Sequence, residues 1–476
     1  MTSFCICPSK KRKKLSARIS SFMLMGTLLI GAADVFSGAA QAQTLSEALT
    51  SAYLNNPTLL SQRASLRASD EGVPQALGNW RPSVSLTGDA GKTYDHNATR
   101  STGERSQNRT PIGYGINISQ TIYRGGRTPA EISGAENTVR AARARLLSAE
   151  QDVLLDAATS YMNVFRDEAV LRLNVSNVQV LVRQLEATRD RFEVGEITRT
   201  DVNQGEARLA GATADRIQSE GDLEASRAAY HNVIGKLAPR NLKFPEQQTD
   251  ILDNKEEVLK AAVTKNPNVI SAEFNLRAAL DRVDGARGEL LPEVDVSASL
   301  TRDFQSSSEI SRTTVATVTL NVDIPLYQQG QVFSGLRRAK QDAAASKLNI
   351  DQARRNATEA AASAWESLKS ARARVNASKT QVEANNSALE GVQQEAAVGS
   401  RTVLDVLDAE QELRDSRVAH VRAQSDQIVA IFELKASIGQ LTARALKLPV
   451  ELYNPKEHYR AVRDKWIGGS SKGGME

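Results

Sequence analysis

The sequence predicts an α+β protein in which two tandem repeats each combine an amphipathic β-hairpin with very long α-helices. Three observations support this fold class: a helix–turn–helix motif that occurs twice, two long stretches without proline, and two hairpins whose apolar and polar residues alternate. The first observation sets the boundaries of the repeats. The other two identify the helices and the strands within each repeat.

Two copies of one helix–turn–helix motif define the repeat. Residues 194–202 match residues 398–406, and the shared positions pair Gly195 with Gly399, Thr198 with Thr402, and Asp201 with Asp405. Glycine suits the left-handed residue just past a helix end, and Thr-x-x-Asp is a capping-box pattern at the start of the next helix. The repeats, 43–235 and 257–439, each hold about 200 residues, far more than a solenoid repeat.

The first 42 residues have the pattern of a secretory signal peptide. Basic residues at 10–14 precede an apolar core at 19–33, and Ala40-Gln41-Ala42 is a small-residue cleavage site. A membrane anchor is the alternative, but the apolar run is shorter than a full span. We therefore expect cleavage before Gln43.

Removal of residues 1–42 changes the composition of the chain. The segment holds both cysteines, Cys5 and Cys7, so disulfide and thiol chemistry would be lost with it. It also holds six basic residues and one acidic residue, which accounts for the excess of basic over acidic side chains. A near-neutral mature chain gives no indication of a nucleic-acid partner.

Two stretches without proline, 130–238 and 326–448, predict the helices. Each begins with a long helix, 127–193 or 331–397, which would extend about 100 Å at ~1.5 Å per residue. A return helix follows, at 200–235 or 403–439, and covers only about half that length. The segment 59–79 before the first strand is placed to pack on the other half.

Apolar residues in the long helices repeat at alternating steps of three and four. In the first repeat these positions are Tyr161, Val164, Leu171, Val175, Val178, Val182 and Leu185, and in the second the same phase includes Trp365, Leu368, Val375, Val382 and Leu389. This spacing favours coiled-coil packing. The core of an ordinary helical bundle is the alternative.

Each repeat contains a hairpin, at 82–124 and 292–326, whose strands are apolar on one face and polar on the other. In the second hairpin Val294, Val296, Ala298 and Leu300 alternate with polar residues, and the returning strand repeats the pattern. Strands of this kind fit a membrane barrel, although a soluble sheet packed on helices gives the same alternation. The helices are too long to cover such sheets, which favours the barrel. The connections at 95–110 and 305–312 are expected to be loops.

Four strands per chain cannot close a transmembrane barrel, because known barrels begin near eight strands. An open sheet edge in lipid would leave backbone groups without hydrogen bonds. The sequence therefore predicts an oligomer, and two, three or four copies all satisfy this argument. The segments 236–256 and 440–476 interrupt the duplication and are placed to form a belt around the helices.

The second hairpin tip carries two carboxylates three residues apart, Asp405 and Asp408, and a nearby arginine, Arg401. Helix capping is one interpretation of Asp201 and Asp405, and a local pair with Asp405 is one interpretation of Arg401; a role at the opening is the alternative for all three. Asp408 is different because its counterpart in the first repeat is Gln204. Copies of this tip around one opening would form a ring that favours cations.

The sequence holds no pattern of catalysis or metal binding. His96, His231, His420 and His458 are scattered without ligand spacing, and no nucleophile elbow, P-loop or dinucleotide fingerprint occurs. The glycines of Arg124-Gly125-Gly126-Arg127 are interpreted as a strand-to-helix turn rather than a phosphate site. We expect a protein that is not an enzyme and has no cofactor.

The duplicated hairpins, the long helices and the tip at residues 398–409 resemble the TolC family of outer-membrane channel-tunnels over essentially the whole mature chain. The resemblance implies a homotrimer with a 12-stranded outer-membrane β-barrel continuous with a coiled-coil helical tunnel in the periplasm of a Gram-negative bacterium. It implies export with an inner-membrane transporter, of the resistance-nodulation-division or ABC type, and a periplasmic adaptor protein.

The resemblance also implies roles for residues of the tips. The family's carboxylate rings at the periplasmic entrance correspond to Asp405 and Asp408, and its closing network corresponds to Arg401 with Thr200 and Asp201. The family tyrosine that helps to close the tip corresponds to Ala396, so one constraint on closure is missing here.

Two functions are carried forward. The first is an exit duct for drugs and toxic compounds or for secreted proteins. The second is a periplasmic adaptor or structural scaffold, which would explain the long helices but not the four amphipathic strands.

Overall fold

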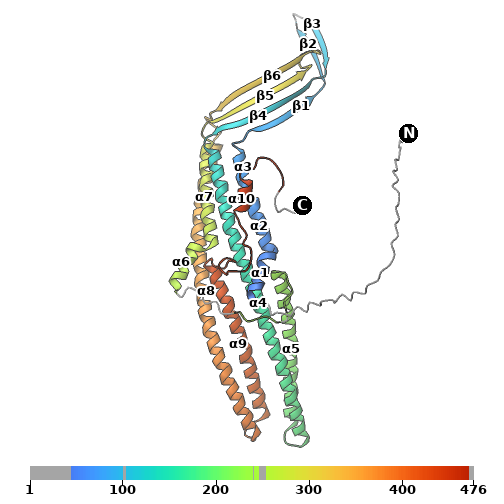
Figure 1. The fold of residues 1–476 in the computed structure, drawn as a ribbon, viewed down its shortest axis with the longest axis vertical. Helices are drawn as coiled ribbons and strands as arrows, with labels where there is room; N and C mark the ends of the chain where they lie inside the picture. The colour runs from blue at the N-terminus through green and yellow to red at the C-terminus, as the bar shows by residue number, and fades with distance from the viewer. Residues whose placement is uncertain (1–43, 100–102, 240, 246–253, 471–476) are drawn as a thin grey trace, which may run out of the picture. The chain divides into compact units, whose positions relative to one another are not determined.

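The computed structural model describes residues 44–99, 103–239, 241–245 and 254–470. The expected signal peptide therefore lies outside the described residues. The elements follow one another in two similar series, each of short helices, strands, a long helix and a return helix (Figure 1). None of the described helices combines the length and the apolar character that crossing a membrane requires.

Short helices open each series. In the first series they are α1 (Leu45–Asn55), α2 (Pro57–Asp70) and α3 (Gly72–Gly78), and in the second α6 (Lys255–Lys265) and α7 (Pro267–Gly288). All of them except α3 begin at a side-chain cap. Asn56 and Asn266 cap α2 and α7, and proline follows each at the first helical position. Proline fits there because the first backbone N–H of a helix has no partner within the helix.

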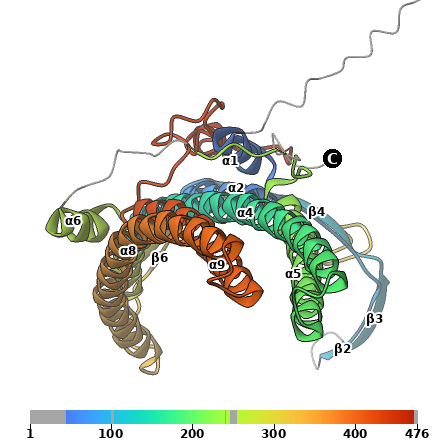
Figure 2. The same ribbon diagram turned by 90° about the horizontal axis from the view of Figure 1, so that it is seen from below.

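The long helices are α4 (Arg127–Glu193) and α8 (Gln331–Ala397), each of 67 residues. They return through α5 (Arg199–Ile234) and α9 (Val403–Ser437). α5 packs on α4 and α9 packs on α8, while α2, α3 and α7 contact the other part of α4. Figure 2 shows α8, α9, α4 and α5 side by side along an arc, with α1 and the C-terminal segment on its outer side.

Burial along α4 follows the predicted heptad in part, since Leu171, Val175 and Val178 are only half-buried. Val164 and Leu185 are buried, but Val182 is 37% exposed and the neighbouring Leu181 is buried instead. The reason is that α4 contacts α9 as well as α5. A helix with two neighbours buries a wider stripe than the seam of a two-stranded coiled coil, so this part of the packing is that of a bundle.

Four strands form one antiparallel sheet in the order β1-β4-β5-β6. They are β1 (Ser83–Ala90), β4 (Ile112–Arg124), β5 (Glu293–Phe304) and β6 (Arg312–Asp323). The central pair, β4 and β5, joins the two series. β1 and β6 are the edges, each with one side unpaired by any strand that the structure describes.

The register places the alternating residues of all four strands on the same face. One row runs across the sheet through Val84, Ile118, Ala298 and Val318, and the next through Leu86, Ile116, Leu300 and Ala316. The rows between them are polar, such as Ser85, Asn117, Ser299 and Thr317. The sheet thus has one apolar face, and Val84, Leu86 and Val318 on it are more than half exposed.

The expected loop at 95–110 is wrong. Most of it lies in a second antiparallel sheet, β2 (Thr93–Thr99) with β3 (Gly103–Arg109). Arg109 joins this hairpin to the β5–β6 turn through an ion pair with Asp95 and a hydrogen bond to the Ser306 carbonyl. The strands lack an apolar alternation, which is the signal that identifies a half-buried strand in a sequence. In the second series the turn is short, although Arg312 already belongs to β6.

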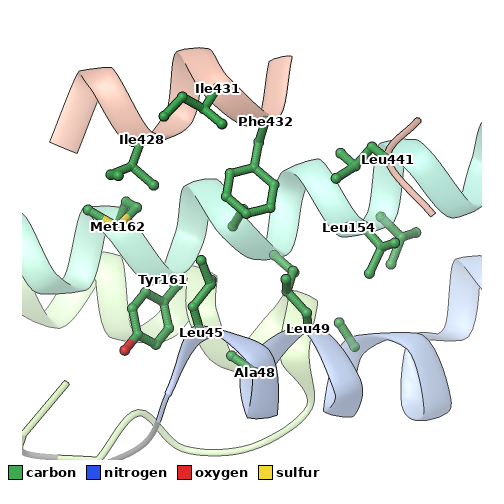
Figure 3. Packing of buried hydrophobic residues seen from close by; sticks show 14 of the residues in the cluster. Leu45, Ala48, Leu49, Leu154, Tyr161, Met162, Ile428, Ile431, Phe432 and Leu441 are labelled. Atoms are coloured by element: carbon green, nitrogen blue, oxygen red, sulfur yellow. The ribbon is translucent and has the colours of Figure 1, made fainter. Parts of the chain in front are cut away.

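The main core lies where the two series meet around the middle of α4. Figure 3 shows Leu154, Tyr161 and Met162 of α4 between α1 and the end of α9, which contributes Ile428, Ile431 and Phe432. Both interrupting segments reach this core: Tyr161 Oη donates to the Lys243 carbonyl at 2.7 Å, and Leu441 is fully buried. The C-terminal segment continues to α10 (Glu457–Val462), which contacts α2.

Candidate functional site: the hairpin tips

Two tight turns close the helical hairpins, and both have the same backbone geometry. Gly195 and Gly399 have φ values of 81° and 79°. The next residues complete the turns, because Glu196 N donates to the Arg191 carbonyl at 2.9 Å and Ser400 N to the Glu395 carbonyl at 3.0 Å. These are the bonds of a Schellman motif. A Cβ at either glycine would meet nothing within 4 Å, so the positive φ alone requires glycine.

Both return helices begin with the predicted capping box. Asp201 Oδ2 accepts from Thr198 N and Asp405 Oδ2 from Thr402 N, each at 2.9 Å, and the threonine hydroxyls accept from the aspartate amides. Hydrogen bonds to the Thr198 hydroxyl and amide lower the pKa of Asp201. The Thr402 amide and hydroxyl likewise lower the pKa of Asp405. Both carboxylates are thus ionised at neutral pH and hold the first turn of their helices.

Arg401 does not contact the first tip within the described chain. Its Nε donates to Glu395 Oε2 at 2.8 Å, on the same hairpin, and this bond raises the pKa of the guanidinium. The described residues show no hydrogen bond or ion pair between Arg401 and Thr200 or Asp201. The expected partnership therefore does not form within one chain. The physical reason is that Glu395 lies within reach on the preceding helix end, whereas the two tips belong to separate hairpins.

Asp408 has a partner that the sequence did not indicate. Arg208 Nη2 of α5 donates to Asp408 Oδ1 of α9 at 2.5 Å. The other terminal nitrogen of Arg208 donates to Gln411, one turn further along α9. One guanidinium therefore joins the two hairpins and places its charge against the carboxylate that the first repeat lacks.

A second bridge crosses between the same helices in the opposite sense. Arg414 of α9 reaches Asp215 Oδ2 of α5 at 3.1 Å and Asn174 Oδ1 of α4 at 3.3 Å. Its side chain is only 18% exposed. We call the two cross-hairpin ion pairs, Arg208–Asp408 and Arg414–Asp215, the hairpin bridges.

A cavity of about 220 Å³ lies between the hairpin bridges and is lined by both arginines. Glu410 also lines it, and burial raises the pKa of this carboxyl group. The contact between α5 and α9 is therefore polar. It is held by ion pairs, with Leu407 buried against Leu181 and Ala212 at one side.

Sequence reasoning missed the hairpin bridges although a signal for them exists. Asp408 was singled out because the duplication places Gln204 opposite it. The same comparison places Glu412 opposite Arg208, Ala210 opposite Arg414 and Ala419 opposite Asp215. Each member of the bridges thus departs from the repeat, as expected where two similar hairpins must pair with each other rather than with themselves.

Three features define the class of this protein: a sheet with one exposed apolar face, long helices of 67 residues that each pair with a return helix of about half that length, and charged hairpin tips. They are the features of an outer-membrane channel with a helical extension. Comparison with known proteins agrees. The chain belongs to the outer membrane efflux protein family, whose model matches residues 48–236 and 258–440.

Curated relatives cover nearly the whole chain. The outer membrane efflux protein BepC of Brucella suis is 33% identical over 450 residues, which are 94% of this chain and 95% of that protein. The outer membrane protein TolC of Vibrio cholerae is 27% identical over 88% of this chain and 96% of its own length. These relatives are outer-membrane proteins of Gram-negative bacteria, and the family is one of channels for transport.

Solved structures share the fold at lower identity. The Campylobacter jejuni CmeC outer membrane channel has a TM-score of 0.76 and 14% identity, and it covers 88% of this chain and 89% of its own. The outer-membrane channel OprN has a TM-score of 0.73 and 21% identity over 83% of this chain and 89% of its own.

Proposed function

We propose that this protein is the outer-membrane exit duct of a tripartite export system, which receives its cargo from an inner-membrane transporter through a periplasmic adaptor. The sheet carries the proposal. Its apolar side chains align across all four strands on one face, and the other face is polar. Such a sheet can face lipid with its apolar side and an aqueous channel with its polar side.

The open edges of the sheet support an oligomer. β1 and β6 each leave one row of backbone groups without a strand partner among the described residues, and in lipid each unmade hydrogen bond costs several kcal/mol. Because neighbouring strands in the sheet are all antiparallel, β6 of one copy can pair with β1 of the next copy in an antiparallel orientation as well. Two, three or four copies would all close a barrel by this pairing. Family membership favours three copies, which gives a 12-stranded barrel.

The long helices are proposed to line a periplasmic tunnel below the barrel. The family model matches the chain twice, at 48–236 and 258–440, which supports two structural repeats per protomer at 43–235 and 257–439. The segments 236–256 and 440–476 would then form the equatorial belt. They contribute Lys243 and Leu441 to contacts with the middle of the molecule's core.

The hairpin tips are proposed to form the periplasmic gate. In a trimer, Asp405 and Asp408 of three copies would ring the entrance, with Gly195 and Gly399 shaping the turns. Arg401 would reach Thr200 and Asp201 of a neighbouring copy only if its ion pair with Glu395 were broken. The hairpin bridges add a closing contact within each copy.

The rival function, a periplasmic adaptor or scaffold, explains the helices alone. Relatives include both efflux and secretion proteins, among them the proteases secretion protein PrtF of Dickeya chrysanthemi and the pyoverdine export outer membrane protein OpmQ of Pseudomonas aeruginosa. Drugs and toxic compounds or secreted proteins are thus both suitable cargo. Copurification with a crosslinked inner-membrane transporter, of the resistance-nodulation-division or the ABC type, would identify the system.

Chemical crosslinking of native outer membranes tests the duct directly. Crosslinked species should end at three copies. The extracted oligomer should migrate as a trimer before heating and as a faster single chain after heating, because a closed barrel resists unfolding in detergent until it is heated. A monomer that stays in solution without detergent would exclude the duct and leave the scaffold.

A further inference from the structure

A second cavity, away from the hairpin tips, lies between α2, the middle of α4 and the segment that follows α9. Its volume is about 380 Å³, which is within the range of small-molecule sites. Arg63, Arg143 and Arg444 line it, together with Tyr453 and one acid, Glu150. We call it the equatorial cavity.

Arg143 is the group in this cavity that lacks acceptors. Its Nε and Nη2 atoms are buried and have no hydrogen-bond partner in the part of the chain that the structure describes, while its guanidinium lies 5.0 Å from the centre of the Tyr459 ring. Unpaired buried donors cost free energy, because their bonds to water are lost without replacement. The nearby carboxyl group of Asp70 interacts with Arg143 by charge. Its Oδ2 lies 3.2 Å from Nδ1 of His458, and its Oδ1 forms no hydrogen bond within the described chain. Arg143 thus has a charged neighbour, but its Nε and Nη2 donors lack a hydrogen-bond acceptor among the described residues.

The second arginine is held rigidly. Arg63 is 9% exposed and lies between two aromatic rings, 4.6 Å from the centre of Tyr53 and 5.1 Å from that of Tyr453. Its Nη2 donates to the Tyr53 carbonyl at 3.1 Å. A guanidinium fixed on aromatic faces keeps its remaining donors in one orientation, which is the arrangement of a preformed site.

The charge of the cavity is positive. Three arginines face one glutamate, and Glu150 accepts a hydrogen bond from Ala443 N at 2.8 Å. Burial raises the pKa of Glu150, and the bond from Ala443 together with Arg63 and Arg444 opposes the rise. Behind Arg143, burial also raises the pKa of Asp70. Even with both carboxyl groups ionised, the arginines outnumber them.

The walls of the cavity between these charges are apolar. Leu59, Leu146 and Leu452 line it beside the tyrosines. A bare inorganic ion would leave most of the volume unfilled. A ligand with one anionic end and an apolar or aromatic body would contact both kinds of wall.

We propose that the equatorial cavity binds a small organic anion, whose carboxylate accepts hydrogen bonds from Arg143 and whose apolar body packs against the leucines and tyrosines. Arginine suits this role because its planar fork matches a carboxylate in two parallel bonds. A bound anion would also join α4 to α2 and the C-terminal segment, since all three line the cavity. The inference rests on this cavity alone and stands apart from the export function.

Calorimetric titration of the purified full-length oligomer in detergent tests the proposal, with benzoate as the probe. Benzoate should bind saturably. Benzamide, which has the ring but no charge, and acetate, which has the carboxylate but no ring, should each bind at least about tenfold more weakly. Affinity should rise as the pH falls toward about 5, where benzoate is still ionised, because protonation of Glu150 removes a negative charge.

Variants separate the site from non-specific binding. Arg143→Gln should lose at least about tenfold in benzoate affinity. Arg140→Gln, on the same helix but outside the cavity, should bind as the unchanged protein does, because Arg140 pairs with Glu136 and Asn137. If Arg143→Gln fails to fold, Arg444→Gln serves, since Arg444 is exposed and lines the cavity. Equal binding by the variants and controls, or tighter binding of inorganic phosphate than of benzoate, would overturn the proposal.

Discussion

The hairpin bridges make a quantitative prediction about opening. Arg208→Gln removes the ion pair with Asp408, which has an N–O distance of 2.5 Å and side chains that are 38% and 54% exposed. Exposed pairs of this kind contribute about 0.2–1 kcal/mol each. In the proposed trimer three pairs break when the hairpins separate together, so closure would lose about 0.6–3 kcal/mol. The opening equilibrium should then shift by about threefold to a hundredfold.

Single-channel recording in planar bilayers measures this shift as open probability or conductance. The same helix offers a matched control: Arg216 is also 38% exposed, but it pairs with Glu220 along α5, at 3.6 Å, rather than across to α9. Arg216→Gln should therefore leave opening unchanged.

A double-mutant cycle assigns the effect to the pair. Asp408→Asn should open the channel about as much as Arg208→Gln, and the double variant should open it no further. Equal opening by Arg208→Gln and Arg216→Gln, in trimers that remain intact, would refute a closing role for the bridge.

Three further predictions concern the tips. Arg401→Ser should raise conductance more than Glu395→Gln if Arg401 reaches a neighbouring copy when the gate is closed; equal effects in the two variants would confine Arg401 to its own hairpin. Asp405→Ala combined with Asp408→Ala should reduce cation preference and block by multivalent cations, and unchanged ion selectivity in a folded trimer would limit both carboxylates to local roles. Folding lowers the pKa of Asp201 and of Asp405, so their caps stabilise the helices fully at pH values above the unfolded-state pKa and lose this effect as the pH falls through the folded-state pKa. Hydrogen-exchange protection at both tips should therefore persist down to about pH 4 and fall at lower pH. Loss of protection between pH 7 and 5 would indicate that other groups control the tips.

The helices and the main sheet were readable in the sequence because each leaves a local signal. The strand-to-helix turn at Gly126, the glycine at Gly195 and the capping threonine at Thr198 mark helix ends with particular backbone and side-chain requirements. Alternation marked the strands, and the register aligned it across the sheet. These signals act within one element, so they can be detected without knowing its neighbours.

Features that depend on a second element were missed. The strands of the β2–β3 hairpin show no alternation of apolar and polar residues, so nothing in their sequence distinguishes them from a polar loop. Leu181 rather than Val182 is buried because α9 packs on a different side of α4 from α5. The spacing of apolar residues along α4 does not reveal this second neighbour. The partners of Asp408 and Arg401 were missed for the same reason, since charged side chains at exposed helix positions can reach several neighbours.

The position of Arg208 links opening to ion attraction in the proposed gate. While the hairpins are joined, the guanidinium lies against Asp408 and offsets its charge. Separation of α5 from α9 would break this contact and leave the carboxylate with its full charge toward the passage. Asp405 would change less, because its partner Thr402 belongs to the same hairpin. The entrance should therefore become more attractive to cations as it widens, an effect that the capped carboxylate alone would not produce.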